Sequence, residues 1–183
     1  MTDLMSTDVV SRWQSGDMEA FETLFRQHER LVFKNAYFIT GSREEAEDVL
    51  QDVFVSIWQA RRDFNPQKAR LTTWLYRITL NKCLDRHRKR QLQAVPLENS
   101  GAEDIEDERQ EIGKGAEFEE LLAALKALDR KHRAVLVLRY FNELSYEEIA
   151  RAAGIPLGTV KSRIYQALKT LRSQLSAPIQ NES

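Results

Sequence analysis

The sequence contains a single cysteine, Cys83, and no apolar run near the roughly 20 residues that a membrane-spanning helix needs. One cysteine excludes an internal disulfide framework, and lone cysteines usually behave as small hydrophobic residues. Residues 1–5 lack the charged and apolar regions of a signal peptide. We therefore expect a cytoplasmic protein that does not insert into the membrane.

Histidine, proline and glycine are also scarce, with three, four and seven residues in a chain of 183. The three histidines are scattered, and the sequence has neither a metal-ligand spacing nor a phosphate-binding loop. These absences argue against a nucleic-acid enzyme, so we predict no catalytic residue, metal or cofactor. The low glycine and proline content, with 42% hydrophobic residues, favours packed cores over disorder throughout.

Charge of one sign gathers in blocks, although the net charge is only −1. Residues 60–91 carry ten Lys/Arg and two Asp, and residues 126–175 carry ten Lys/Arg and four acids. Between them, residues 94–120 carry ten Asp/Glu and two basic residues. Either basic block alone could be a solvated helix surface, but two blocks that flank an acidic segment indicate a nucleic-acid partner.

A helix-turn-helix is readable near the C-terminus. Ser145 and Glu148 form a predicted capping box, Gly154 suits a tight turn, and Pro156 suits the first turn of a second helix. The residues of that second helix expected to face inward are Val160, Ile164, Ala167, Leu168 and Leu171. Those expected on the opposite side are Thr159, Ser162, Arg163 and Gln166, whose types can reach phosphates and base edges.

A second capping box, Ser42 with Glu45, predicts a helix over about 43–60. Its apolar stripe consists of Ala46, Val49, Leu50, Val53, Ile57 and Ala60, and Asp48, Gln51 and Val55 lie on the far side. Phe54 and Trp58 flank the stripe. Apolar residues so far from the stripe predict either a partner surface or a broader core contact.

A further helix is predicted over about 71–90, after the break at Asn65-Pro66. At 100° per residue, one face of this helix carries Trp74, Arg77, Asn81 and Arg88. An aromatic ring, an amide and two guanidinium groups in one column can stack a base, bond its edge and hold the backbone. Taken alone, a tryptophan such as Trp74 is more often part of a core.

The overall pattern predicts an all-α protein with two small helical domains, since no strand alternation is present. The first domain covers 1–91 and the second 118–175. Between them, 92–117 is rich in acids and contains Pro96 and three glycines, which predicts a flexible acidic linker. Residues 176–183 form a C-terminal tail.

Together, four motifs resemble the extracytoplasmic-function (ECF) group of bacterial RNA polymerase sigma factors. They are Ala20-Phe21-Glu22-x-Leu24, Ala46-Glu47-Asp48-Val49-x-Gln51-Asp52-x-Phe54, Thr73-Trp74-Leu75-Tyr76-Arg77-Ile78-x-x-Asn81 and the run 144–164. The resemblance implies that 1–91 is sigma region 2, 118–175 is sigma region 4, and the linker passes through the polymerase active-site cleft and RNA exit channel.

The resemblance also implies roles for individual residues. The positions that match the surface docking on the clamp of the polymerase largest subunit are Asp48, Gln51, Asp52, Phe54 and Trp58. Those that match the melted −10 element are Trp74, Asn81 and Asp85, with Arg77, Arg88 and Arg90 supporting the DNA backbone. Those that match the helix reading the −35 element are Thr159, Lys161, Ser162, Arg163, Tyr165 and Gln166.

The partners implied by the resemblance are promoter DNA, core RNA polymerase through its clamp and flap, and an anti-sigma factor. Asp85 and Gln166 depart from the basic or amide residues often found there in relatives, so a relative's promoter motif cannot be borrowed. The main alternative is a helix-turn-helix regulator that binds DNA without joining the polymerase. It would leave the surface around Asp48 and the column around Trp74 unexplained.

Overall fold

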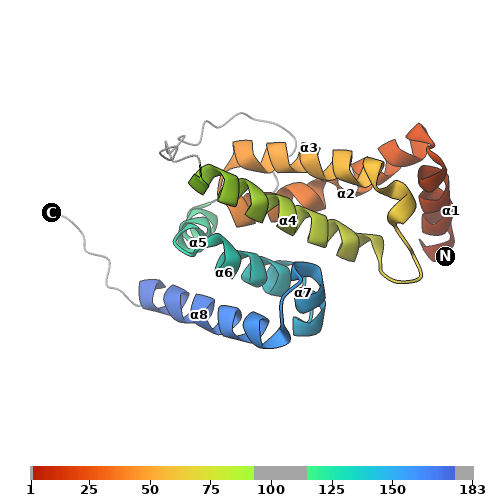
Figure 1. Ribbon diagram of the computed structural model, residues 1–183. Helices are drawn as coiled ribbons and strands as arrows, with labels where there is room; N and C mark the ends of the chain where they lie inside the picture. The colour runs from red at the N-terminus through yellow and green to blue at the C-terminus, as the bar shows by residue number, and fades with distance from the viewer. Residues whose placement is uncertain (1, 93–114, 176–183) are drawn as a thin grey trace.

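A computed structural model describes residues 2–92 and 115–175, which form helices and no strand (Figure 1). The first domain contains α1 (Thr2–Ser15), α2 (Met18–Thr40), α3 (Arg43–Gln59), the short 3-10 turn η1 (Arg61–Asp63) and α4 (Leu71–Leu92). The second contains α5 (Ala116–Lys126), α6 (Arg130–Leu136), the π-helical turn η3 (Val137–Phe141), α7 (Tyr146–Ala153) and α8 (Leu157–Leu175). The predicted all-α class and two-domain architecture are confirmed.

Local sequence signals account for most of the helix boundaries. Asp17 Oδ1 accepts hydrogen bonds from two backbone N–H groups at the start of α2, and Asp129 does the same at the start of α6. Gly41 ends α2 in the left-handed conformation, with φ of 73°, and donates its N–H to the Tyr37 carbonyl. Ser42 then opens α3 by accepting a bond from the Glu45 N–H.

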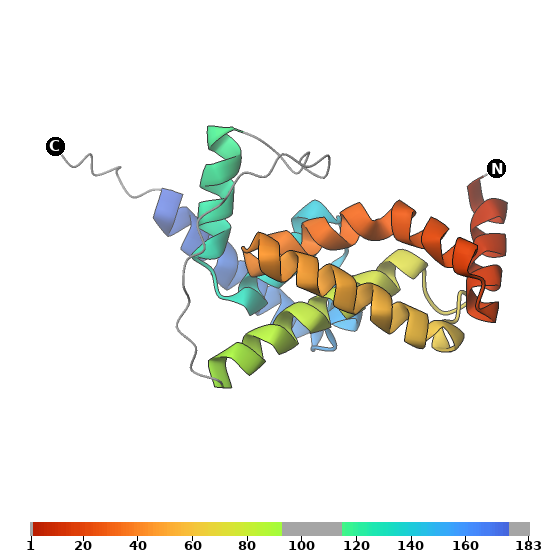
Figure 2. The same ribbon diagram turned by 90° about the horizontal axis from the view of Figure 1, so that it is seen from above.

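Aromatic residues dominate the core of the first domain. Trp13 on α1 and Phe64, just after η1, lie 6.0 Å apart between ring centroids, and both pack against Trp74 on α4. A second group joins α2 to α3 and consists of Phe21, Phe25, Phe54 and Trp58. The first group ties α1 to α4 and the second ties α2 to α3, and α3 and α4 both pack against α2, as seen from above in Figure 2.

The second domain packs its helix-turn-helix against α5 and α6. Its buried residues include Leu122, Leu125, Leu128, Ala134, Val135, Leu138, Ile149, Ala152, Val160, Ile164 and Ala167. The second domain lies beneath α2 and α4 in Figure 1, with α7 against α4 and α6 against α2. The apolar core is therefore continuous between the two domains.

The predicted linker, 92–117, and tail, 176–183, lie largely outside the described residues. At the far end of the linker, α5 already begins at Ala116, two residues before the predicted start of the second domain. No helix in the described ranges has the length and apolar content that a membrane crossing requires.

Candidate nucleic-acid interface and associated surfaces

The helix-turn-helix forms as the sequence predicts. Ser145 and Glu148 make both hydrogen bonds of the capping box, and these bonds lower the pKa of Glu148 below its ordinary value of 4.5. Gly154 takes the left-handed conformation, with φ of 63°, and bonds the Ala150 carbonyl. This hydrogen-bonded turn sets the angle at which α8 leaves α7.

Helix α8 presents a polar arc to the solvent. Lys161, Ser162, Tyr165 and Gln166 are exposed, and Tyr165 retains 65% of its accessible surface. Thr159 and Arg163 are half-buried at the edges of the arc. The predicted inward residues are buried or half-buried, so the face assignment is confirmed for this helix.

One residue of this arc was missed from the sequence. Lys169 is exposed and lies one helical turn beyond Tyr165 and Gln166, where it extends the arc with a positive charge. Its i+4 spacing from Tyr165 was the available signal.

The predicted column on α4 divides into a half-buried base and an exposed remainder. Trp74 is half-buried, because its ring packs against Trp13 and Phe64, so its core role is established. Arg77, Asn81, Asp85 and Arg88 are exposed, and Arg88 forms an ion pair of 3.2 Å with Asp85. The side chain of Arg90 lies outside the described side chains.

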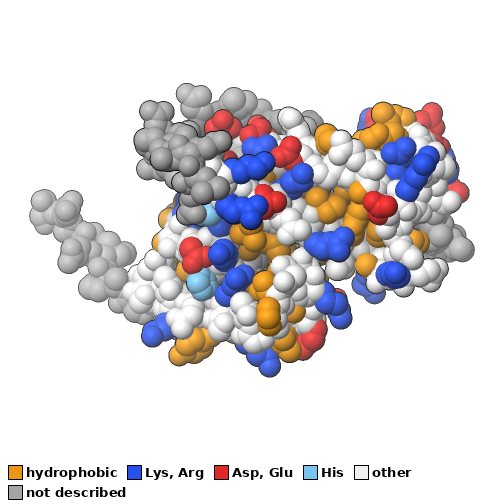
Figure 3. Space-filling model, viewed as in Figure 1, with side chains coloured by type: hydrophobic (Ala, Val, Ile, Leu, Met, Phe, Trp, Pro, Cys, Tyr) orange, Lys and Arg blue, Asp and Glu red, His pale blue; other side chains and the backbone are white. Residues whose placement is uncertain are grey.

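The loop between η1 and α4 also borders this column. Phe64 packs against Trp74 there, and Lys68 and Arg70 of the loop are exposed, as is Arg62 at the centre of η1. Sequence reasoning treated this segment as a helix break and counted its basic residues within the block 60–91, without assigning them to the column on α4. Figure 3 shows Lys and Arg side chains spread over both domains on the side turned to the viewer.

The outward face of α3 carries the other predicted surface. Asp48, Gln51 and Asp52 follow one another at helical spacing, and Val55, one turn further on, keeps 55% of its accessible surface. Trp58 is half-buried, with the Arg61 guanidinium 4.4 Å above its ring. An acidic face with an exposed apolar residue and a partly exposed indole can bind a basic, partly apolar partner surface.

Phe54 does not belong to this face and requires a correction. Its side chain is only 4% exposed, and its ring lies 4.6 Å from that of Phe25 between centroids. The aromatic residues of α2 widen the buried side of α3 beyond the apolar stripe. The prediction that Phe54 is displayed to a partner is therefore wrong, and the broader core contact is the observed outcome.

The two carboxylates of the α3 face are tied to α4 by one arginine. Arg86 Nη1 donates to Asp48 Oδ2 at 2.7 Å, while its Nε and Nη2 donate to Asp52 Oδ2 at 3.0 and 2.9 Å. These bonds use one oxygen of each carboxylate, and the two side chains remain 47% and 43% exposed. The geometry fixes the carboxylates relative to each other and couples the α3 face to the basic helix α4.

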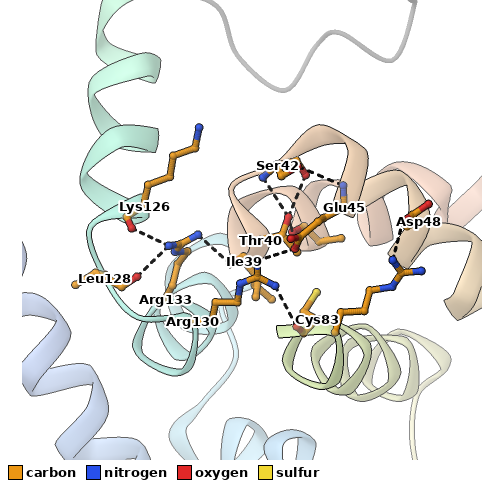
Figure 4. A network of polar contacts seen from close by, with 12 residues as sticks. Ile39, Thr40, Ser42, Glu45, Asp48, Cys83, Lys126, Leu128, Arg130 and Arg133 are labelled. Carbon is orange, nitrogen blue, oxygen red and sulfur yellow. Dashed lines mark hydrogen bonds and ion pairs between the residues drawn. The ribbon is translucent and has the colours of Figure 1, made fainter. Parts of the chain in front are cut away.

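The two domains meet at an interface that buries charge (Figure 4). The Glu45 carboxylate lies 2.6 Å from Arg130 Nη2, and the two side chains are 3% and 9% exposed. Arg130 also donates to the Cys83 carbonyl on α4. One half of the predicted box at Ser42 therefore forms, but the Glu45 carboxylate reaches the second domain.

Arg133, one turn beyond Arg130, bridges the same two domains. Its guanidinium donates to the Lys126 and Leu128 carbonyls within the second domain and to the Ile39 carbonyl at the end of α2, at 2.9 to 3.0 Å (Figure 4). Burial, followed by the nearby charge of Arg130, lowers the pKa of Arg133 to about 10. It therefore stays protonated at neutral pH.

Apolar and amide contacts complete this interface. The ring of Phe38 on α2 lies 4.4 Å from that of Phe141 on η3, and Asn35 donates to Asn142 at 3.3 Å. We use the name interdomain interface for Asn35, Phe38, Ile39, Glu45 and Cys83 with Arg130, Arg133, Phe141 and Asn142. Cys83 is fully buried there, and burial raises its pKa to about 12, so its thiol is inert.

Comparison with known proteins identifies the family of this chain. Residues 24–93 match the model of sigma-70 region 2, and residues 118–171 match that of sigma-70 region 4. The ECF RNA polymerase sigma factor SigW of Bacillus subtilis is 30% identical over 94% of this chain and 98% of its own length. RpoE of Cereibacter sphaeroides is 34% identical over 87% and 88%, respectively.

A third relative, SigE of Mycolicibacterium smegmatis, is 35% identical over 87% of this chain, which spans only 63% of the length of SigE. Among solved structures, CnrH in complex with the cytosolic domain of CnrY is 27% identical, with a TM-score of 0.67 over 93% of this chain and 96% of CnrH.

RpoE bound to the anti-sigma factor NepR, from Bartonella quintana, is 23% identical and shares the fold, with a TM-score of 0.72 over 88% of this chain and 99% of that one. The alternative of a regulator that acts outside the polymerase is not favoured by these matches. The chain belongs to the ECF sigma factors, the promoter-directing subunits of bacterial RNA polymerase.

Proposed function

We propose that the exposed arc of α8 reads the −35 element. The observation that carries this proposal is a capped helix-turn-helix whose second helix presents polar and basic side chains along one face. Gln166 can form a bidentate pair with adenine, whereas Arg163 suits guanine. Lys161 and Lys169 supply phosphate contacts that orient the helix without reading sequence.

The α4 column and the adjoining loop are proposed to bind the −10 element. A base removed from the duplex costs a few kcal/mol to unstack. Stacking on an aromatic side chain contributes about 1–3 kcal/mol per base, so the exposed edge of Trp74 together with Asn81 is of the right size to hold one base. Arg77 and Arg88 lie beside them for the DNA backbone.

The outward face of α3 is proposed to bind the clamp of the polymerase largest subunit. Asp48, Gln51, Asp52 and Trp58 support this role, and Val55 joins them, while Phe54 acts only from the core. Arg86 holds both carboxylates in place before the partner arrives, which reduces the entropy lost on binding.

The remaining assignments follow from membership of the family. We infer that the chain works in the cytoplasm, where its polymerase is, and that catalysis belongs to the polymerase. The acidic segment 92–117 is proposed to occupy the active-site cleft, and an anti-sigma factor is proposed to hold the protein inactive. The relative RpoE of Bartonella quintana was solved with such a partner.

The decisive experiment is run-off transcription with purified core polymerase on genomic fragments selected by the holoenzyme. We expect initiation to depend on this chain and Asp52→Asn to weaken core binding, whereas Glu47→Gln, a change outside the proposed face of the same helix, has little effect. DNA binding without core polymerase, combined with no promoter-dependent transcript, would instead identify a separate regulator.

A further inference from the structure

Helix α1, which has no role in the proposed function, holds the backbone at the start of the loop between η1 and α4. We propose that Gln14 of α1 is a positioning residue for −10 recognition, because it fixes the direction in which this loop, residues 64–70, leaves η1. The inference rests on the proposed function, in which α4 and the adjoining loop bind the −10 element.

The Gln14 side chain bonds to backbone that lies 47 and 50 positions further along the chain. Its Nε2 donates to the Arg61 carbonyl at 3.2 Å and to the Phe64 carbonyl at 2.6 Å. These carbonyls belong to the first residue of η1 and to the residue directly after it. Since a side-chain amide has two N–H donors, one glutamine holds both ends of the turn.

The preceding residue of α1 contacts the same segment through its ring. Trp13 is fully buried, and its ring lies 6.0 Å from those of both Phe64 and Trp74 between centroids. Within the described ranges Trp13 Nε1 has no hydrogen-bond partner, so this contact is apolar and non-directional. Hydrogen bonds, in contrast, weaken steeply when their angle changes. Gln14 therefore supplies a directional restraint on the chain at Phe64 that the rings do not.

The loop itself is folded by local bonds, so its anchors decide where it points. Asn65 Oδ1 accepts the Gln67 N–H at 2.9 Å, and the Asn65 carbonyl accepts the Lys68 N–H at 3.1 Å. These bonds, together with the fixed φ of Pro66, hold 65–68 in one compact turn. A rotation at Phe64 therefore moves the whole turn, including exposed Lys68, relative to the Trp74 ring.

The other end of η1 contacts the surface proposed to bind the clamp. Arg61 Nη1 donates to the Trp58 carbonyl at 2.8 Å, and the Arg61 guanidinium lies over the Trp58 ring. A change at Gln14 thus has two routes to promoter binding, one through the loop and one through Trp58. Binding to core polymerase must therefore be measured apart from binding to the −10 element.

Two variants remove the donor in chemically different ways. Gln14→Met keeps the approximate length of the side chain without an N–H, and Gln14→Glu places a carboxylate oxygen against the two carbonyl oxygens. Gln27→Met on α2 is the matched control, because it makes the same change at an exposed position outside every proposed binding surface. Urea unfolding of each variant sets the temperature at which all are folded and compared.

The assay is equilibrium binding of the holoenzyme to a fork promoter, with a double-stranded −35 element and an unpaired −10 element on the non-template strand. An abasic site replaces each −10 base in turn, and the largest loss of affinity by the unmodified protein identifies the captured base. Comparison of the intact template with that abasic template then measures how far each variant uses the base.

The expected result is a loss confined to the captured base. A hydrogen bond of ordinary net strength corresponds to about a two- to twelvefold change in an equilibrium constant. If the loop of Gln14→Met is correctly placed about a tenth of the time, the variant should bind the intact fork about tenfold more weakly. Gln14→Glu should lose at least as much. On the abasic template, and in affinity for core polymerase, both should match the unmodified protein and Gln27→Met.

The proposal is overturned if either Gln14 variant binds the intact fork as tightly as the unmodified protein does. An equal loss on the abasic template would also overturn it, since a general structural defect has that effect, and so would a loss in core affinity, which acts through Trp58. If the unmodified holoenzyme bound the intact fork no better than every abasic template, the proposed capture of a −10 base would itself be wrong, and this inference with it.

Discussion

Replacement of Phe54 by alanine separates a core role from a polymerase-binding role at one position. The side chain is 4% exposed and packs edge-on against Phe21 and closely against Phe25. Phenylalanine-to-alanine changes in cores cost about 3–5 kcal/mol of the free energy of unfolding. Two aromatic pairs, each worth about 0.5–1.5 kcal/mol beyond burial, place Phe54→Ala in the upper part of that range.

The assay is urea unfolding followed by helical circular dichroism. With a slope of about 2 kcal/mol per molar urea, a loss of about 4 kcal/mol lowers the unfolding midpoint by about 2 M. Val55→Ala is the matched control, because Val55 is the next residue on α3 and is exposed. Its midpoint should change little, since surface changes usually stay within about 0.5 kcal/mol.

Polymerase binding measured at low temperature, where both variants are folded, completes the comparison. We expect Val55→Ala to weaken binding more than Phe54→Ala does. If Phe54→Ala left the unfolding midpoint unchanged and abolished polymerase binding, the assignment of Phe54 to the core would be refuted.

Four further variants test the DNA contacts and the pH dependence. Trp74→Ala should spare binding to a −35 fragment but impair open-complex formation, and permanganate footprinting that showed normal melting would contradict this role. Gln166→Arg should shift the preferred base at one −35 position from adenine towards guanine, while Lys169→Ala should weaken all sequences alike and reduce the salt slope by about one, both measurable by competition binding. The pKa of Glu148 is lowered in the folded protein, so its contribution to stability is present above its unfolded pKa and is lost as pH falls through the folded value. The unfolding midpoint should therefore fall more steeply between pH 6 and pH 3 for the unmodified protein than for Glu148→Gln. If the midpoint depended on pH equally in both proteins, the Glu148 cap would not be a source of the pH dependence.

The helices and their faces were largely predictable because their signals are local. Ser145, Glu148 and Gly154 lie within ten residues of one another, and each sets a backbone conformation regardless of distant partners. The exposed arc of α8 follows from helical periodicity alone. The family motifs placed these faces in the order of sigma regions 2 and 4, which the comparisons confirm.

The contacts between distant segments were not predictable in the same way. The width of the buried side of α3 depends on Phe21 and Phe25, which reach Phe54 from α2. A helical wheel drawn for α3 alone contains no information about them. The bonds of Arg86 to Asp48 and Asp52 likewise join residues 38 and 34 positions apart.

Glu45 illustrates how one sequence signal can serve two structural purposes. Its backbone N–H takes part in the cap at Ser42, as the spacing predicts. Its carboxylate, however, pairs with Arg130 in the other domain. The spacing fixed the position of the residue on α3 but could not identify the partner of its side chain, because that partner lies 85 residues further along the chain.

The π-helical turn η3 has a consequence for how the interdomain interface can change in evolution. It lies between α6, which supplies Arg130 and Arg133, and the helix-turn-helix, and it ends at Phe141 next to Asn142. One residue fewer in this turn would rotate Phe141 by about 100° relative to α6, away from Phe38. We therefore expect insertion or deletion of a single codon here to change how the two domains pack in related lineages while leaving the residues of α8 unaltered.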